Sequence, residues 1–212
     1  MSDRKDLYIH LFKSQMATLK ERGYPQTAID EFEAQQKEVI DTALIMSTFN
    51  GNIPFIPVYR CAKSVVAKLM KTVQEGTLRG YAPFHIDLEK INDESEITEK
   101  FYFIYDVEDG GEMTGESPSS AKNYVKDKER HGLTLSEGIA LCVHTRVLSK
   151  HAVGCAGSNY VLSRREITMP GIQLSEPGGL MGRGFQGRPE ITWRYLDMPL
   201  NEWGVASCLF RK

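Results

Sequence analysis

The segment from His131 to Tyr160 holds the densest group of side chains that could do chemistry. Glu137, His144 and His151 follow one another at intervals of seven residues, and Cys155 comes shortly afterwards. An interval of seven is about two turns of an α-helix, so the spacing predicts that the three ionisable side chains share one face. The residues between them are mostly apolar, which predicts a buried helix on which these groups need partners or have shifted pKa values.

Cys155 and His144 form a candidate catalytic pair. Cys155 lies in a run of small residues, GCAGSNY, which would let the backbone approach a ligand closely. A neighbouring imidazolium would support a thiolate, which is the nucleophilic form of cysteine. One interpretation of the chain is therefore a Cys-His dependent hydrolase or transferase, with Cys155 as the nucleophile and His144 as the base.

A metal site is not expected in this segment. Cys142 and His144 are two residues apart and would point to opposite sides of a helix. His144 and His151 would lie about 10 Å apart along the helix axis. Zinc ligands on a helix are typically three or four residues apart, because the metal–ligand bonds are only about 2 Å long. The sequence therefore predicts neither a metal nor another cofactor.

A second group of candidate residues lies in the loop from Glu176 to Arg188, which contains several glycines and two arginines. The run GRGFQG at residues 182–187 matches GxGxxG, the pattern of dinucleotide-binding loops. Such a loop must be followed by a helix, whereas Pro189 and a strand-like run, EITWRYL, follow here. The loop is therefore not expected to bind a nucleotide by that pattern, although its guanidinium groups suit carboxylate or phosphate.

The leading interpretation is a protein that binds a small anionic ligand between the predicted helix at Thr134 and the Gly/Arg-rich loop. The candidate binding residues are Glu137, His151, Arg183 and Arg188. The charge distribution agrees with an anionic ligand, because residues 146–212 carry a formal charge of +4 and the preceding residues carry −6.

The elements that would position these residues begin with two N-terminal helices. Apolar residues recur at helical spacing over residues 7–19, and Gly23 followed by Pro25 ends that helix. Thr27 is expected to cap a second helix that ends at Asn50 and Gly51. Residues 1–50 therefore predict a helical hairpin, appended to a sheet-containing body at residues 51–212 within one domain. A third interpretation is a structural or interaction protein that forms a homodimer through these helices.

The sequence of residues 51–212 predicts several strands and two further helices. The run FYFIYDV at residues 101–107 is the clearest strand, and the run IPFIPVY at residues 53–59 is expected at a sheet edge because proline cannot donate to a ladder. One helix is expected to start at Ser119 or Ser120. Another starts with the capping box of Thr134 and Glu137. The fold class is therefore α+β, with a helical hairpin on a mixed or antiparallel sheet and a β-rich C-terminus.

Composition narrows the class of protein. A chain of 212 residues with 41% hydrophobic residues suits a single domain with a sizeable core. The net charge of −2 argues against a dedicated binder of nucleic acid or of membrane surfaces. No apolar run has the length of a signal peptide or a membrane span, and the four cysteines form no CxxC pair, so a cytoplasmic protein with free thiols is expected.

Several short blocks resemble an uncharacterised bacterial family, a domain of unknown function of about 200 residues. These blocks are RGYP, IPFIPV, LTLSEGIAL, GCAGSNY and WGVASC, and together they span nearly the whole chain. The chain departs from the family pattern at Asn159, where the family carries an arginine. The resemblance implies a bacterial cytoplasmic setting and no known activity, so it assigns no catalytic residue.

Overall fold

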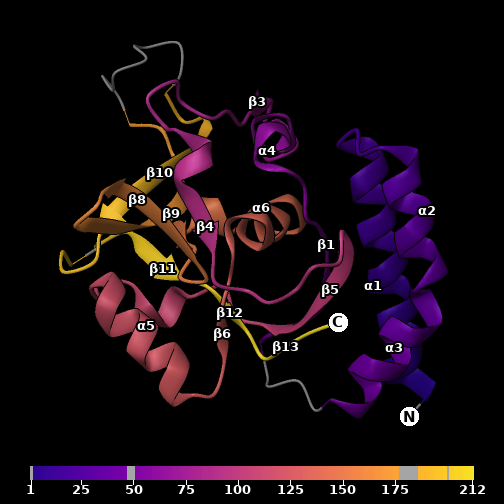
Figure 1. Cartoon of the computed structure of the whole chain (residues 1–212). Helices are drawn as coiled ribbons and strands as arrows, with labels where there is room; N and C mark the ends of the chain where they lie inside the picture. The colour runs from indigo at the N-terminus through magenta and orange to yellow at the C-terminus, as the bar shows by residue number, and fades with distance from the viewer. Residues whose placement is uncertain (1, 47–50, 177–185, 200) are drawn as a thin grey trace.

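The computed structural model describes residues 2–46, 51–176, 186–199 and 201–212. These residues form an α+β fold with six α-helices and thirteen strands (Figure 1). The α-helices are α1 (Ser2–Glu21), α2 (Gln26–Ala34), α3 (Gln36–Ile45), α4 (Lys63–Met70), α5 (Pro118–Asp127) and α6 (Leu135–His144). The strands are β1 (Ile53–Tyr59), β2 (Gln74–Glu75), β3 (Leu78–Arg79), β4 (Ile91–Asp93), β5 (Phe101–Val107), β6 (His131–Gly132), β7 (Ala152–Gly154), β8 (Ser158–Ser163), β9 (Glu166–Leu174), β10 (Pro189–Tyr195), β11 (Trp203–Val205), β12 (Ser207–Cys208) and β13 (Phe210–Arg211). Short 3₁₀ turns include η1 (Leu88–Lys90), η2 (Gly111–Met113) and η3 (Val147–Ser149).

Helix α6 lies at the centre of the molecule, between two sheets (Figure 1). It contacts β1 on one side and β9 on the other. Its residues from Leu135 to Val143 are all buried, as the apolar sequence of this segment predicts. The predicted capping box is confirmed, because the Thr134 side chain accepts from the Glu137 N–H and the Glu137 carboxylate accepts from the Thr134 N–H.

Two sheets flank α6. The first is antiparallel, with the strand order β1-β5-β13, and the predicted strand at residues 101–107 is confirmed as its central member. Strand β1 lies at the edge of this sheet, as predicted. Proline is tolerated at an edge because its missing N–H can face the side on which no strand pairs. The second sheet has the order β11-β7-β9-β8-β4, and β10 also pairs with β9. This second sheet is mixed, because β11 runs parallel to β7 whereas all the other strand pairs of the sheet are antiparallel.

The N-terminal helices cover the outer face of the first sheet (Figure 1). Phe12 of α1 and Phe32 of α2 are buried against Phe103 of β5. One continuous apolar core therefore joins the helices to the body, so the segment expected to be an appendage is part of the core. None of the described helices combines the length and the apolar character that a membrane span needs.

Three predicted helix boundaries differ from the structure. The second predicted helix is divided at Gln35 into α2 and α3, which lets α3 pack against both α1 and β1. Its cap is Pro25 rather than Thr27, and α5 starts after Ser117 rather than at Ser119 or Ser120. Helix α5 is capped by the Ser117 hydroxyl, which accepts from the Ser120 N–H. No side chain caps α2, so the tertiary position of the chain sets its first turn.

The C-terminal end of α5 is a left-handed turn made by a residue other than glycine. Glu129 has a φ of 53°, and its N–H donates to the Lys126 carbonyl. The next N–H, that of Arg130, donates to the Val125 carbonyl, which completes a Schellman motif. This turn directs the Arg130 side chain inward, and 4% of that side chain is exposed.

Replacing Glu129 with glycine should stabilise the protein by about 1 kcal/mol, because glycine adopts a positive φ without the steric cost of a Cβ atom. For a chain of this size the change corresponds to about 2–4 °C in Tm, measured by thermal unfolding. Glu129→Ala is the matched control, because it removes the same carboxylate and keeps the Cβ atom. An equal gain from alanine would show that the charge, and not the backbone, is responsible.

Candidate functional site

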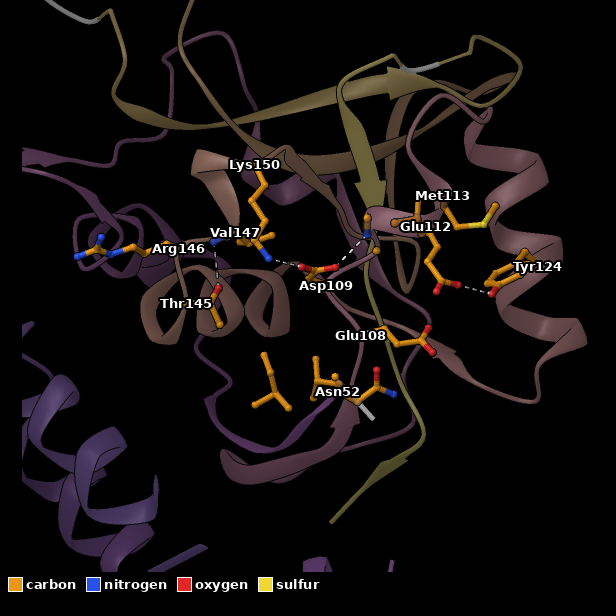
Figure 2. Close-up of a pocket in the computed structure, with 16 residues that line it drawn as sticks. Asn52, Glu108, Asp109, Glu112, Met113, Tyr124, Thr145, Arg146, Val147 and Lys150 are labelled. Carbon is orange, nitrogen blue, oxygen red and sulfur yellow. Dashed lines mark hydrogen bonds and ion pairs between the residues drawn. The ribbon is translucent and has the colours of Figure 1, made fainter. Parts of the chain in front are cut away.

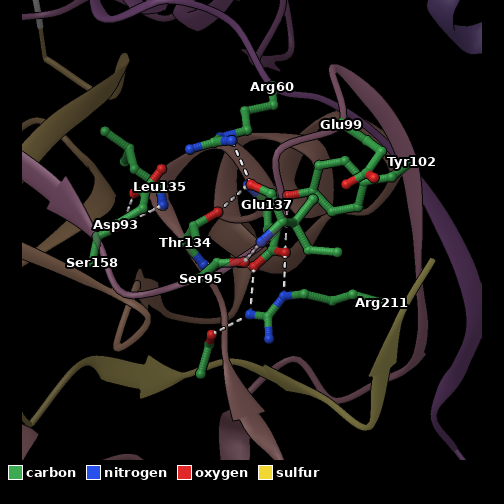
Figure 3. Close-up of polar contacts among 12 residues, drawn as sticks. Arg60, Asp93, Ser95, Glu99, Tyr102, Thr134, Leu135, Glu137, Ser158 and Arg211 are labelled. Atoms are coloured by element: carbon green, nitrogen blue, oxygen red, sulfur yellow. Dashed lines mark hydrogen bonds and ion pairs between the residues drawn. The ribbon is translucent and has the colours of Figure 1, made fainter.

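Glu137 is a structural residue. Its carboxylate is fully buried and accepts hydrogen bonds from Arg211 Nε at 2.7 Å and from Arg211 Nη2 at 2.9 Å (Figure 3). The Tyr102 hydroxyl and the Thr134 N–H also donate to it. Since every direction around the carboxylate is taken by protein donors, the structure does not present Glu137 to a ligand.

His144 is the last residue of α6 and is closed off from solvent at both ring nitrogens. Neither nitrogen has a hydrogen-bond partner among the described residues. Burial, with a smaller contribution from the Arg22 guanidinium, lowers its pKa to about 3. A neutral imidazole in this closed position is not placed to act as a base on a bound substrate.

Cys155 lies away from His144 and is completely buried. A Cβ atom on Gly138 would lie 2.5 Å from its sulfur, so Cys155 packs against the middle of α6. His144 is six residues further along that helix, or about 9 Å along its axis. Burial raises the pKa of the Cys155 thiol well above its usual range, so the residue stays a neutral thiol. The structure therefore does not bring Cys155 and His144 together as a catalytic pair.

The predicted stripe of three ionisable groups does not exist, because α6 ends before it reaches His151. Thr145 is extended, and its hydroxyl donates to the Leu141 carbonyl at 2.7 Å. That bond satisfies a carbonyl that the next helical turn would have used. His151 follows η3 and occupies a different part of the fold.

The structure does not place the two arginines of the predicted anion site beside Glu137, His144 and His151. Arg183 lies outside the described residues. Arg188 packs its guanidinium over the Tyr81 ring, 5.0 Å from the centroid, and its Nε donates to the Arg79 carbonyl. Arg188 of the Gly/Arg-rich loop thus contacts the segment before β4.

A cavity of about 420 Å³ lies at the C-terminal end of α6 (Figure 2). It is lined by the start of β1, the end of β5, η2, α5, the residues that follow α6, and β11. Small-molecule sites commonly have volumes of about 300–1,000 Å³, with mainly apolar walls and a few converging polar groups. Ile53, Val107, Val147 and Val205 supply the apolar surface here.

The backbone beside this cavity is unusual in two places. Asp106 in β5 is fully buried with a φ of 51°, which residues other than glycine rarely adopt. Asn52 and Arg130 hold its carboxylate at 2.6 and 3.3 Å. Gly110, with a φ of 90°, turns the chain where a Cβ atom would clash with the Val205 backbone. Strained positions of this kind persist only where their surroundings fix them, and they concentrate at functional sites.

Asp109 is the most strongly perturbed group in the cavity wall. Its carboxylate accepts from the Gly111 N–H at 3.0 Å and from Lys150 Nζ at 3.2 Å. His151 Nε2 lies 3.9 Å from Asp109 Oδ1, while His151 Nδ1 donates to the Ala152 carbonyl at 2.9 Å. The His151 ring, together with the Gly111 N–H and Lys150, holds the pKa of Asp109 well below its usual range, and Asp109 in turn raises the pKa of His151.

Two further carboxylates line the opposite side of the cavity. Glu112 accepts from the Tyr124 hydroxyl at 3.1 Å, and burial and this neighbour raise the pKa of Tyr124. Glu108 pairs through one oxygen with Arg130 Nε at 3.2 Å and accepts from Ser207 Oγ at 3.1 Å. Each carboxylate keeps acceptor capacity that a ligand could use.

The arrangement suits binding better than nucleophilic catalysis. The Thr145 hydroxyl donates to Leu141 and accepts from the Val147 N–H, so it is not paired with a base. The His151 ring faces Asp109 and the Ala152 carbonyl with its two nitrogens. Across the described residues, no three His, Cys, Asp or Glu side chains converge in a way that could hold a metal ion.

The sequence patterns did not single out Asp109, nor Asn52, Glu112, Tyr124 or Lys150. The signal that could have drawn attention to Asp109 is an acidic residue directly before two glycines at the end of the clearest strand. The other residues lie on separate elements, and no local pattern connects them.

A protein-family model described as a family of unknown function (DUF5701) matches residues 14–212. No curated protein and no solved structure matches the chain.

Replacing Asp109 with asparagine should lower the pKa of His151, measured by NMR titration of the imidazole. The His151–Asp109 attraction stabilises the fold fully between about pH 4 and 6.5, the ordinary pKa values of the two groups. It is lost as pH rises through the raised pKa of His151 or falls through the lowered pKa of Asp109. The loss of stability in the variant should therefore be larger at pH 5.5 than at pH 9.

Asp41→Asn, on the exposed face of α3, is the matched control for this charge change and should leave the pKa of His151 as it is. An unchanged pKa of His151 in Asp109→Asn would contradict the pairing.

Replacing Glu137 with glutamine should cost about 3–5 kcal/mol in unfolding free energy, because it leaves the Arg211 guanidinium without its buried counter-ion. Glutamine is also a capping-box residue, so the change isolates the charge from the cap. Urea unfolding of the Glu137→Gln/Arg211→Met double variant checks the cause, and it should recover at least half of the loss. A double variant as unstable as Glu137→Gln would contradict a role for the ion pair.

Proposed function

The chain belongs to this family of unknown function, and we propose that it binds a small zwitterionic molecule with an apolar portion in the cavity at the end of α6. The ligand's amino group would lie against Glu108 and Glu112. Its anionic group would lie against Lys150, with Arg146 at the rim. A free amino acid with an aliphatic side chain has this combination of groups.

The observation that carries the proposal is the division of the polar lining. Lys150 is on one side of the cavity, with Arg146 at its rim and pointing away from the other labelled residues, and Glu108 and Glu112 are on the other side (Figure 2). Between them lies an apolar surface that includes Val147 and the start of β1. Since opposite charges at separated positions cannot both be satisfied by a simple anion or a simple cation, a molecule that carries both charges is the best complement.

Pre-formed geometry supports binding as the role of this cavity. Asp109 fixes Lys150 at 3.2 Å, and Tyr124 fixes Glu112 at 3.1 Å before any ligand arrives. Groups that are already oriented lose less conformational entropy on binding. The sequence predicted a small anionic ligand bound by Glu137, His151, Arg183 and Arg188. The present proposal keeps the anionic group, adds an amino group, and assigns the anionic group to Lys150 and Arg146 instead.

The alternative interpretations have less support. The hydrolase or transferase interpretation needs a thiolate, and Cys155 is a buried thiol. The dimer interpretation needs an extended free apolar face on the N-terminal helices, yet Tyr8, Phe12 and Phe32 are buried against the body. The large apolar side chains exposed on the described part of these helices are Leu7 and Ile45.

Thermal unfolding in the presence of each of the twenty protein amino acids at 10 mM tests the proposal. At ten times its Kd a ligand stabilises the folded state by about 1.4 kcal/mol, or about 3–5 °C in Tm for a chain of this size. The best amino acid should exceed both its decarboxylated amine and its deaminated acid, because each analogue leaves one side of the cavity unpaired.

Two variants locate the effect. Glu112→Gln should weaken the contribution of the amino group, and Lys150→Met should weaken that of the carboxylate. Glu31→Gln and Lys37→Met, exposed on α2 and α3, are the matched controls. A panel that leaves Tm unchanged, or Tm shifts that survive in both cavity variants, would refute the proposal.

A further inference from the structure

A second cavity, of about 360 Å³, lies on the other side of α5, and most of its charged lining side chains are cationic. Lys122 and Lys126 come from α5, Arg130 follows that helix, and Arg211 comes from β13. Glu94 is the one carboxylate among its described lining residues. This cavity shares no lining residue with the cavity at the end of α6.

The two arginines are fixed by buried carboxylates behind them. Arg211 uses Nε and Nη2 to hold Glu137 and the Gly132 carbonyl (Figure 3). Its Nη1 makes no hydrogen bond with the described residues, which leaves two N–H donors for a ligand. Arg130 is held by Asp106, Glu108 and Ser207, so its charge is already balanced and it contributes a fixed part of the cavity wall rather than new hydrogen bonds.

The two lysines of α5 supply ammonium groups on long, flexible side chains. Lys122 and Lys126 are four residues apart and therefore lie on the same face of α5. Lys122 Nζ donates to Asn159 Oδ1 at 3.0 Å and lies 3.5 Å from Glu94 Oε1. Lys126 has no ion pair or hydrogen bond from its ammonium group in the part of the chain that the structure describes. An anion would give Lys126 its first counter-ion.

Two glycines let the floor of this cavity form. A Cβ atom on Gly157 would clash with the Gly132 carbonyl, and one on Gly132 would lie 2.8 Å from the Ala156 Cβ. The close approach of these two backbones brings β6, with His131, beside the turn that follows β7. The cationic groups of α5 and β13 consequently face one shared hollow.

Acidic residues next to the cavity limit the kind of anion. Glu94, Glu96 and Glu99 line the adjoining hollow, which also contains His131 and Arg211. An extended polyanion such as nucleic acid would pass over these carboxylates and be repelled by them. A compact anion that stays within the cationic cavity avoids that repulsion.

We infer that this second cavity binds the phosphate group of a small molecule. Arg211 Nη1, Lys122 and Lys126 donate to the phosphate oxygens, and Arg130 forms part of the wall behind them. A phosphate group fits because it is compact, carries up to two negative charges and accepts several hydrogen bonds.

Isothermal titration with inorganic phosphate and with pyrophosphate, at constant ionic strength set with chloride, tests this site. The wild-type protein should bind at least one of the two, and Lys126→Met should weaken that binding at least 10-fold. Lys128→Met is the matched control on the same segment, because Lys128 Nζ lies over the Tyr124 ring and not in this cavity. It should bind as the wild type does.

Three outcomes would overturn the inference: no heat of binding beyond that of chloride, equal affinities in Lys126→Met and Lys128→Met, or tighter binding of a single-stranded oligonucleotide than of pyrophosphate. Circular dichroism of both variants verifies that they are folded. Amino-acid binding at the end of α6 should be the same in Lys126→Met, so the failure of one site is distinguishable from the failure of the other.

Discussion

Both cavities depend on the ion pairs and hydrogen bonds of the buried Arg130 guanidinium. It donates to the Asp106 backbone carbonyl, pairs with the Asp106 carboxylate at 3.3 Å and with Glu108 at 3.2 Å, and donates to Ser207 Oγ at 2.8 Å. These contacts hold the left-handed turn at Asp106 on one side, and Arg130 itself lines the cationic cavity on the other. Because a buried charge without a partner is costly, the set of partners must form as a unit.

A second buried ion pair, between Glu137 and Arg211, stabilises the centre of the fold. Glu137 joins the capping box of α6 to Arg211 near the C-terminus, so the first turn of the central helix and strand β13 are held together by one carboxylate. Both buried arginines are oriented by protein groups on one side. The binding groups proposed for the two cavities therefore sit on a framework that is rigid before a ligand arrives, which lowers the entropy cost of binding.

The two proposed sites differ in the charges of the side chains that line them. The cavity at the end of α6 has separated positive and negative sides with an apolar surface between them. The cavity beside β6 is predominantly cationic and is bordered by glutamates. Helix α5 lies between them and contributes Tyr124 to the first cavity and Lys122 and Lys126 to the second, since residues two apart on a helix face different directions.

The sequence by itself determined the local features. The capping box at Thr134, the burial of α6, the central strand at residues 101–107 and the edge position of the proline-containing strand follow from patterns within a few residues. Family membership over residues 14–212 also agrees with the short blocks that resemble a domain of unknown function.

Only the tertiary structure decided which polar groups meet. Glu137 and Arg211 are 74 residues apart, and Arg130 and Ser207 are 77 apart, so no local pattern could pair them. The seven-residue spacing of His144 and His151 suggested one helical face, yet Thr145 ends the helix by bonding back to Leu141. Side-chain exposure is set by long-range packing, and that is why the residues richest in chemistry along the chain are mostly enclosed while the cavities are built from others.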